Sequence, residues 1–252
     1  MQADLGQPST LKTAFSGADA VYGVTNFYDS ANAVDPLNEA RQGCTMADVA
    51  KETGVKLFIW STVPSALLVS KAHFDSPRLV ENKFYVSQYL KYQKVPHVDV
   101  YLGFYMDNWI NFGQISKGAD GVIEITQPRL NPDVKLGMTW IKRDLGRVVA
   151  GILGKFFKGE DVLGRSFYCV SGQYNTNDLR DTIQQELGLK ARINTPPAVG
   201  IRDLDVMYDY YNVWGVYRDI AIPDPATSSL IGNFSSLSDY VKGEMGPAIK
   251  NL

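Results

Sequence analysis

Short apolar runs alternate with longer helical patterns along this chain, and that alternation is the strongest constraint on its fold. Residues 18–25, 56–61 and 97–102 are short runs rich in β-branched and aromatic side chains. Helical patterns lie between them, at residues 38–53 and 77–93. Strands that alternate with helices form βαβ units, in which neighbouring strands run parallel. The sequence therefore predicts an α/β fold built on a doubly wound parallel sheet.

The second half of the chain continues this pattern less regularly. Further strands are predicted at residues 121–126, 135–141 and 165–170. Amphipathic helices are predicted at residues 143–157 and 177–187, the second with Thr176 as its N-cap. The segment from Pro223 onward is rich in Ser, Asp, Gly and Pro, so we expect it to wrap the surface.

The first residues depart from the usual opening of a doubly wound domain. Such a domain begins with a strand, a glycine-rich turn and a helix N-terminus, whose backbone N–H groups bind pyrophosphate. Here residues 1–5 read as the end of a strand that leads into a short helix after Pro8. None of the 22 glycines belongs to a G-x-G-x-x-G or G-x-x-x-x-G-K-S/T motif. We therefore expect an N-terminally truncated sheet.

Composition excludes several classes of protein. The formal net charge is -2 over 252 residues and no Lys/Arg run exceeds two, so we expect no direct nucleic-acid contact. No apolar run approaches the roughly 18 residues of a membrane span, which predicts a cytoplasmic protein, with the nucleus as an alternative. With two cysteines and two histidines in the whole chain, neither a disulfide framework nor a metal site is expected.

Four short segments in a fixed order carry a resemblance to a known family. They are GADAV at residues 17–21, HFDS at 73–76, GFYMDNW at 103–109 and RDLGRVV at 143–149. Together they resemble the NmrA-like family, a group of atypical short-chain dehydrogenases. The match begins after the position of that family's glycine-rich strand-turn-helix.

The resemblance implies a domain arrangement and a cofactor. Residues 1–115 would form an incomplete NAD(P)-binding Rossmann-like core, and residues 116–252 mainly a small α/β substrate lobe. Within the lobe, residues 135–170 would return strands and a helix to the core. The implied cofactor is NADP(H) or NAD(H), and without the glycine-rich turn its binding is expected to be weak.

Lys83 is the sharpest catalytic candidate. At helical spacing it falls on one face with Leu79, Val86 and Leu90, so a cation interrupts an apolar stripe. The family pattern has no counterpart of the six residues 77–82. If these residues are an insertion, the resemblance implies that Lys83 contacts the nicotinamide ribose and the substrate carbonyl. The alternative is a lysine that snorkels to solvent. Short-chain dehydrogenases pair this lysine with a tyrosine four residues earlier, but that position is Leu79.

Other residues could replace the missing tyrosine or contact the cofactor. The further catalytic candidates are Thr62, His73 and Tyr105, each with a purely structural role as its alternative. The residues implied in cofactor binding, besides Lys83, are Thr25, Asn26, Phe27, Ser61, Gly103 and Phe104. The aromatic stretch at residues 208–214 is predicted either to line the substrate lobe or to pack inside it.

Three functions follow from these observations. The first is a reductase or isomerase that acts on a small organic molecule. The second is a dinucleotide-sensing regulator that binds a protein partner, which the missing tyrosine favours. The third is a truncated, inactive product. The truncated sheet would leave residues 20–24 as an open apolar edge, so a homodimer through that edge is also predicted.

Overall fold

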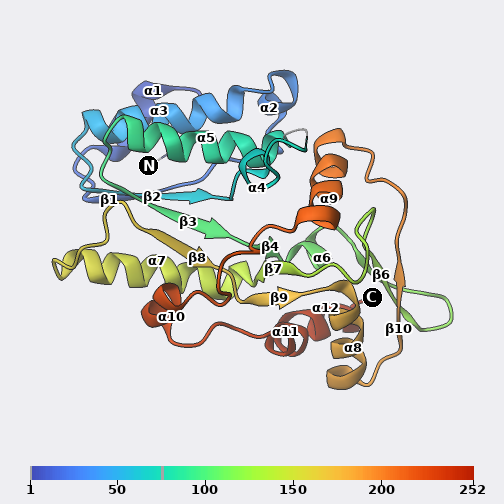
Figure 1. The fold of residues 1–252 in the computed structure, drawn as a ribbon. Coiled ribbons are helices and arrows are strands. Elements are labelled where there is room, and N and C mark those ends of the chain that lie inside the picture. The colour runs from blue at the N-terminus through green and yellow to red at the C-terminus, as the bar shows by residue number, and fades with distance from the viewer. Residues whose placement is uncertain (1, 75–76) are drawn as a thin grey trace.

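A four-stranded parallel sheet forms the centre of the computed structural model, which describes residues 2–74 and 77–252 (Figure 1). Its strands, in spatial order, are β1 (Ala20–Gly23), β2 (Leu57–Thr62), β3 (His97–Leu102) and β8 (Ser166–Cys169). All three neighbouring pairs are parallel. Four of the six predicted strands therefore form one sheet, and their ends differ from the predicted ends by only a few residues. The strands predicted at residues 121–126 and 135–141 belong to two other sheets.

β2 shows why this sheet needs helices on both faces. All six of its residues are buried. Leu57 and Ile59 pack into the core on one face, whereas Phe58 and Trp60 pack into the core on the other. A strand without a polar face is typical of a parallel sheet covered on both sides.

Two helical layers cover the sheet (Figure 1). The first layer contains α1 (Pro8–Phe15), α3 (Asn38–Glu52) and α5 (Arg78–Tyr92). The second contains α7 (Ile141–Phe157) and α10 (Pro225–Ile231), which pack against each other. The predicted doubly wound α/β fold is therefore confirmed.

A glycine allows α3 and α5 to pack closely against β2. A Cβ atom on Gly43 would lie 2.4 Å from a methyl carbon of Val86 and 3.2 Å from the Trp60 ring. Trp60 also donates a hydrogen bond from its indole nitrogen to the carbonyl of Lys83, at 3.0 Å. This bond fixes the part of α5 that carries the lysine.

A smaller α/β lobe extends from the ends of the parallel strands. One of its sheets is β4 (Phe104–Tyr105), β7 (Leu136–Thr139) and β9 (Gly172–Tyr174), and the other is β5 (Ile115–Lys117), β6 (Ile123–Thr126) and β10 (Ala191–Asn194). The longer lobe helices are α8 (Thr176–Leu187) and α9 (Arg202–Trp214). Short helices are α2 (Ser30–Val34), α4 (Ala66–Val69), α6 (Asn108–Asn111), α11 (Leu237–Tyr240) and α12 (Gly246–Lys250), with a π-helical turn at Val241–Met245.

Two ion pairs fasten α9 beside the strand ends. The buried Asp203 carboxylate accepts hydrogen bonds from the backbone N–H and the guanidinium of Arg78, at 2.9 Å each for the backbone N and Nε. Asp209 accepts two hydrogen bonds from the Arg129 guanidinium, both at 2.7 Å. The first contact holds α9 against α5 of the core, and the second holds it against the loop between β6 and β7 of the lobe.

The C-terminal segment does not wrap the surface, so that prediction is wrong. Leu237, Tyr240, Val241, Met245 and Ile249 are all buried in the core of the lobe. Leu237, Val241, Met245 and Ile249 recur every four residues and, with Tyr240, form one helical face. The many Ser, Asp, Gly and Pro residues of the segment hid this apolar period.

The opening residues also differ from the expectation. Residues 2–7 contain no strand. Instead the Asp4 N–H donates to Thr10 Oγ1 at 2.9 Å, and the Asp4 carboxylate accepts from the Gly6 N–H at 2.8 Å. These local bonds tie the segment to the first turn of α1.

No helix in residues 2–74 or 77–252 has both the length and the apolar character needed to cross a bilayer.

Asp144 on α7 is the buried polar centre that joins the core to the C-terminal segment. Its carboxylate is fully buried and accepts hydrogen bonds from Arg147, Ser171, and both the backbone and the hydroxyl of Ser235, at 2.9 to 3.2 Å. Arg147 also donates to the Ile231 carbonyl at 2.7 Å. The carboxylate therefore holds α7 and the segment before α11 in place.

We predict that Asp144→Ala lowers the free energy of unfolding by about 3–5 kcal/mol, because Arg147 and two hydroxyls lose a buried acceptor. Urea denaturation measures this change. Asp181→Ala is the matched control: its carboxylate is 62% exposed in a pair with Arg180, so the expected loss is below about 1 kcal/mol. Equal effects of the two substitutions would contradict the assigned role of Asp144.

Candidate functional site

A cavity of about 640 Å³ lies where β1, β2 and β3 end, between the parallel sheet and the lobe. In open α/β sheets, ligands bind at the carboxyl ends of the strands, because the loops that follow them meet there. The wall of the cavity is mostly apolar and contains seven aromatic residues: Phe27, Tyr28, Phe104, Tyr105, Phe112, Tyr208 and Tyr211. The volume is that of a typical small-molecule site.

The loops after β1 and β3 supply most of the core side of this wall. Thr25, Asn26, Phe27, Gly103 and Phe104 all line the cavity. The structure thus brings together five of the six residues that the sequence implied in cofactor binding besides Lys83. Their contact with a cofactor stays a prediction.

Gly103 is required at this place by packing. A Cβ atom there would lie 2.5 Å from the carbonyl oxygen of Gly137 on β7. The Gly103 N–H donates to Thr139 Oγ1 at 3.0 Å, and Thr139 donates in turn to the Cys169 carbonyl at 2.5 Å. This close approach lets the core sheet join the lobe sheet directly beneath the cavity.

Two exposed aromatic rings meet beside the cavity. Tyr28, after β1, and Phe112, after α6, pack edge to face with centroids 5.9 Å apart. Their side chains remain 53% and 56% exposed. Tyr28 belongs to the core and Phe112 to the lobe, so this contact joins the core to the lobe at the cavity.

The Lys83 ammonium reaches the cavity wall but is fully engaged. It donates to the Thr25 carbonyl at 2.8 Å, to Thr25 Oγ1 at 2.9 Å and to Glu39 Oε1 at 2.6 Å. The Lys83 side chain is 15% exposed and the Glu39 side chain is 1% exposed. An ammonium group has three N–H donors. All three therefore have acceptors within the protein.

Glu39 is the residue of this site that sequence reasoning missed. It lies in the first turn of α3 and its carboxylate also accepts from Thr25 Oγ1 at 2.9 Å. In the sequence it reads as an ordinary acidic residue that favours a helix N-terminus. Only the approach of α3 to α5 shows that it neutralises Lys83.

Comparison with known proteins identifies the family. Residues 1–247 match the NmrA-like family. The chain belongs to the NmrA-like family.

Relatives and solved structures agree with this assignment. An NmrA-like family domain-containing protein of Dictyostelium discoideum is 32% identical over 123 residues, which are 46% of this chain and 39% of that relative. The matched stretch is thus well under two thirds of the relative's length.

The crystal structure of NmrA, a negative transcriptional regulator, covers the whole chain with a TM-score of 0.80 at 18% identity, over 82% of its own length. Its complexes with NAD and NADP give 0.77 and 0.79, both at 17% identity, full coverage of this chain and 82% of their own length. The Citrobacter sp. triphenylmethane reductase complexed with NADP(H) gives 0.68 at 15% identity over 95% of this chain and 81% of the reductase. At these identities the likeness establishes the fold alone.

Tyr105 is the predicted acid that this NmrA-like chain does bring to the cavity. It follows β3 and lines the wall. Burial raises the pKa of its phenol well above the ordinary value, and the nearby Tyr22, Cys169 and Asp107 raise it further. The phenol is therefore protonated at neutral pH and can donate or accept a hydrogen bond.

Three other predicted residues do not line the cavity. Ser61 and Thr62 are buried inside β2, where Thr62 Oγ1 accepts from Ser87 Oγ at 3.0 Å. His73 is exposed; its Nδ1 lies 2.7 Å from the Ser70 carbonyl and its ring contacts Trp214 with centroids 5.7 Å apart. The rest of the HFDS stretch, Asp75 and Ser76, lies outside the described residues.

We predict that Glu39→Gln lowers the free energy of unfolding by about 3 kcal/mol, because it leaves the Lys83 charge buried without its partner. The double substitution Glu39→Gln/Lys83→Met should recover most of this loss, because it removes both charges. Urea denaturation of the three proteins measures the effect.

The exposed pair Lys12–Glu52 provides the control, with side chains 48% and 57% exposed. Glu52→Gln should cost less than about 1 kcal/mol. If Glu39→Gln costs no more than Glu52→Gln, or if the double variant is less stable than the single one, the buried ion pair is not the state of Lys83 in solution.

Proposed function

We propose that this chain is a ligand-binding regulator. In this proposal a nicotinamide dinucleotide and a small organic molecule bind at the cavity, and their binding changes the affinity for a protein partner. The observation that carries the proposal is the state of Lys83. Its three donors are held by Thr25 and Glu39, so none is left to bind a ribose hydroxyl or polarise a substrate carbonyl.

The position and lining of the cavity support dinucleotide binding. It lies at the strand ends where doubly wound folds bind nucleotides. Thr25 and Asn26 put polar groups at its core side, and Phe27 offers a ring to a flat base or nicotinamide. The complexes of NmrA with NAD and with NADP agree with this ligand class.

The proposal also states that this chain binds the dinucleotide weakly. The 252 residues include no glycine-rich turn that would offer backbone N–H groups to the pyrophosphate. The ribose contact expected of Lys83 would also require an ion pair to break. Both observations favour an affinity well below that of a dinucleotide-dependent reductase.

A reductase that acts on a small organic molecule is the second candidate. Tyr105 favours it, because a protonated phenol in the cavity wall could donate a proton to a reduced carbonyl. In short-chain dehydrogenases a nearby ammonium makes the phenol more acidic. In this chain the pKa of the Tyr105 phenol is raised instead of lowered, so the phenol is a weaker acid, which favours the regulator.

Calorimetric titration with NADPH and NADH tests the dinucleotide proposal. We predict dissociation constants in the millimolar range, because several charge-assisted hydrogen bonds of about 1.5–3 kcal/mol each are lost relative to a site with the turn. The variant Glu39→Gln/Lys83→Met should bind within about twofold of the natural chain, since the lysine contributes no contact.

A dissociation constant below about 10 μM would contradict weak binding. Consumption of NADPH in the presence of a carbonyl compound, abolished by Tyr105→Phe, would replace the regulator with the reductase. Loss of binding in the double variant would mean that Lys83 leaves Glu39 to reach the cofactor.

The self-association proposal rests on the edge of the central sheet. Among the described strands, β1 pairs only with β2, so its other side has no hydrogen-bonded neighbour. Val24, directly after β1, is 45% exposed. Open apolar edges recruit further strands, and a second copy of the chain offers an identical one.

We predict that light scattering at micromolar concentration gives twice the 27.9 kDa of one chain. Val24→Lys should shift the protein toward the monomer, because a lysine at an edge opposes strand pairing. Tyr92→Lys on α5, where the side chain is 81% exposed, is the control and should leave the mass unchanged. A compact monomer of the natural chain would contradict the proposal.

A further inference from the structure

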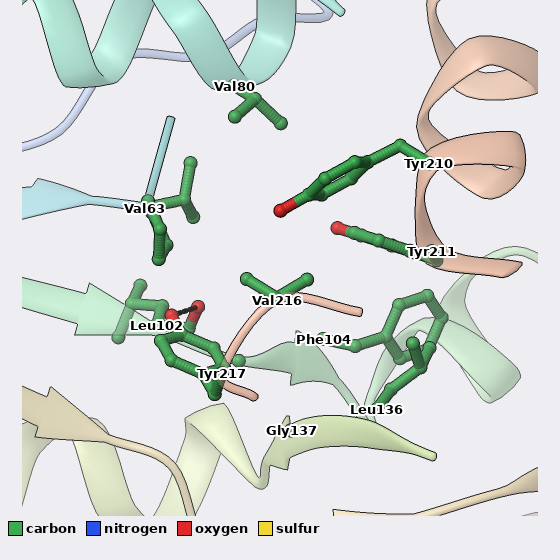
Figure 2. A pocket seen from close by; sticks show the side chains of 12 residues that line it. Val63, Val80, Leu102, Phe104, Leu136, Gly137, Tyr210, Tyr211, Val216 and Tyr217 are labelled. Carbon is green, nitrogen blue, oxygen red and sulfur yellow. Dashed lines mark hydrogen bonds between the residues drawn. The ribbon is translucent and has the colours of Figure 1, made fainter. Parts of the chain in front are cut away.

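A second, smaller cavity of about 40 Å³ adjoins the large one on the side of α9 (Figure 2). The two share Val63, Val80, Gly103, Phe104 and Tyr211 in their walls. A void of this size can hold a few atoms, such as a water molecule or one end of a larger molecule. It therefore lies next to the large cavity, behind residues that line both.

The hydroxyl of Tyr210 is the polar group of this small cavity that lacks a partner. Tyr210 is 1% exposed, and no atom of residues 2–74 or 77–252 forms a hydrogen bond with its hydroxyl. Figure 2 shows the hydroxyls of Tyr210 and Tyr211 pointing from α9 toward Val63. Almost all buried polar groups in proteins have a partner. A group from outside the chain would complete this site.

Neighbouring buried tyrosines show the contrast. Tyr217 donates to the Leu102 carbonyl at 2.6 Å, as the dashed line in Figure 2 marks. Tyr240 donates to the Met106 carbonyl at 2.8 Å. Both hydroxyls are thus satisfied by backbone oxygens, whereas Tyr210 ends at an open space.

The wall of the small cavity is closely packed and uncharged. A Cβ atom on Gly137 would lie 2.6 Å from the Tyr217 ring, so the glycine is needed for Tyr217 to pack beside β7. The ring of Tyr210 is held on its other side by Phe74, edge to face at 6.1 Å. None of the lining residues carries a charge. A charged ligand group would therefore be unpaired there, which is costly in a buried site.

We propose that the small cavity anchors the neutral carbonyl oxygen of a flat, apolar ligand whose body lies in the large cavity. This inference rests on the proposed function, since it names the small organic molecule that the regulator binds. Burial raises the pKa of the Tyr210 phenol, so the hydroxyl remains protonated and is the donor to the ligand oxygen. Phe27, Phe104 and Tyr208 provide flat apolar surface for the body.

Methyl naphthyl ketone and ethylnaphthalene are suitable probes, because they have nearly the same shape and differ in the carbonyl oxygen. The natural chain should bind the ketone roughly 5- to 10-fold more tightly, which is the effect of one neutral hydrogen bond. Tyr210→Phe should abolish this preference and leave the affinity for ethylnaphthalene unchanged. Tyr92→Phe, on the exposed face of α5, is the control and should keep the preference.

Two further measurements separate a ligand contact from a structural role. The carbonyl stretch of the bound ketone should move to lower wavenumber in the natural chain and not in Tyr210→Phe. Without ligand, Tyr210→Phe should melt at the same or a higher temperature, because it removes an unpaired hydroxyl. A lower melting temperature would show that the hydroxyl already has a partner and would overturn the proposal.

Equal binding of the two probes by the natural chain, failure of both to bind, or a ketone preference retained in Tyr210→Phe would likewise overturn it. NADPH titration of the same proteins tests the proposed function separately. Unchanged NADPH affinity in Tyr210→Phe is the expected result, and a loss would assign the small cavity to the nicotinamide amide instead. Loss of ketone selectivity with NADPH binding retained would contradict only the carbonyl anchor. Loss of NADPH binding with ketone selectivity retained would contradict only the proposed dinucleotide binding.

Discussion

The parallel direction of the four core strands is the constraint on which the rest of the structure depends. Successive parallel strands need crossovers, and here helices cover both faces. β2 makes the cover obligatory, because Leu57 and Ile59 face one layer while Phe58 and Trp60 face the other. The same direction brings the ends of β1, β2 and β3 to one edge. The cavity lies at that edge, so its place follows from the sheet.

A second constraint is the burial of a charge at this edge. The close packing of α3 and α5 that Gly43 allows brings Glu39 within 2.6 Å of Lys83. A buried ammonium needs such a partner, because an isolated charge in the interior is strongly unfavourable. The pairing changes what the site can do. The lysine stabilises the junction between β1 and the two helices instead of meeting a ligand with free donors.

The sequence is sufficient to predict most of the fold but only part of the site. The four core strands and the main helices that cover them could be predicted because their apolar period is local, and the cluster Thr25, Asn26, Gly103 and Tyr105 follows from strand ends that share an edge. Glu39 could not be found this way, because its partner is distant along the chain. The short lobe strands β4, β5, β9 and β10 and the helix α9 were not predicted. The C-terminal helices were hidden by a composition typical of loops, although Tyr240 and Met245 lie on one apolar face.

The two polar ends of the cavity differ in a way that bears on how a ligand would be oriented. On the core side, Thr25, Lys83 and Glu39 satisfy one another, and a ligand group there must displace a bond that already exists. On the side of α9, the Tyr210 hydroxyl has no such bond to lose. A hydrogen bond formed with an unpaired buried group also removes the penalty of leaving it unpaired. The stronger directional preference therefore belongs to the α9 end, although the charged residue lies at the other.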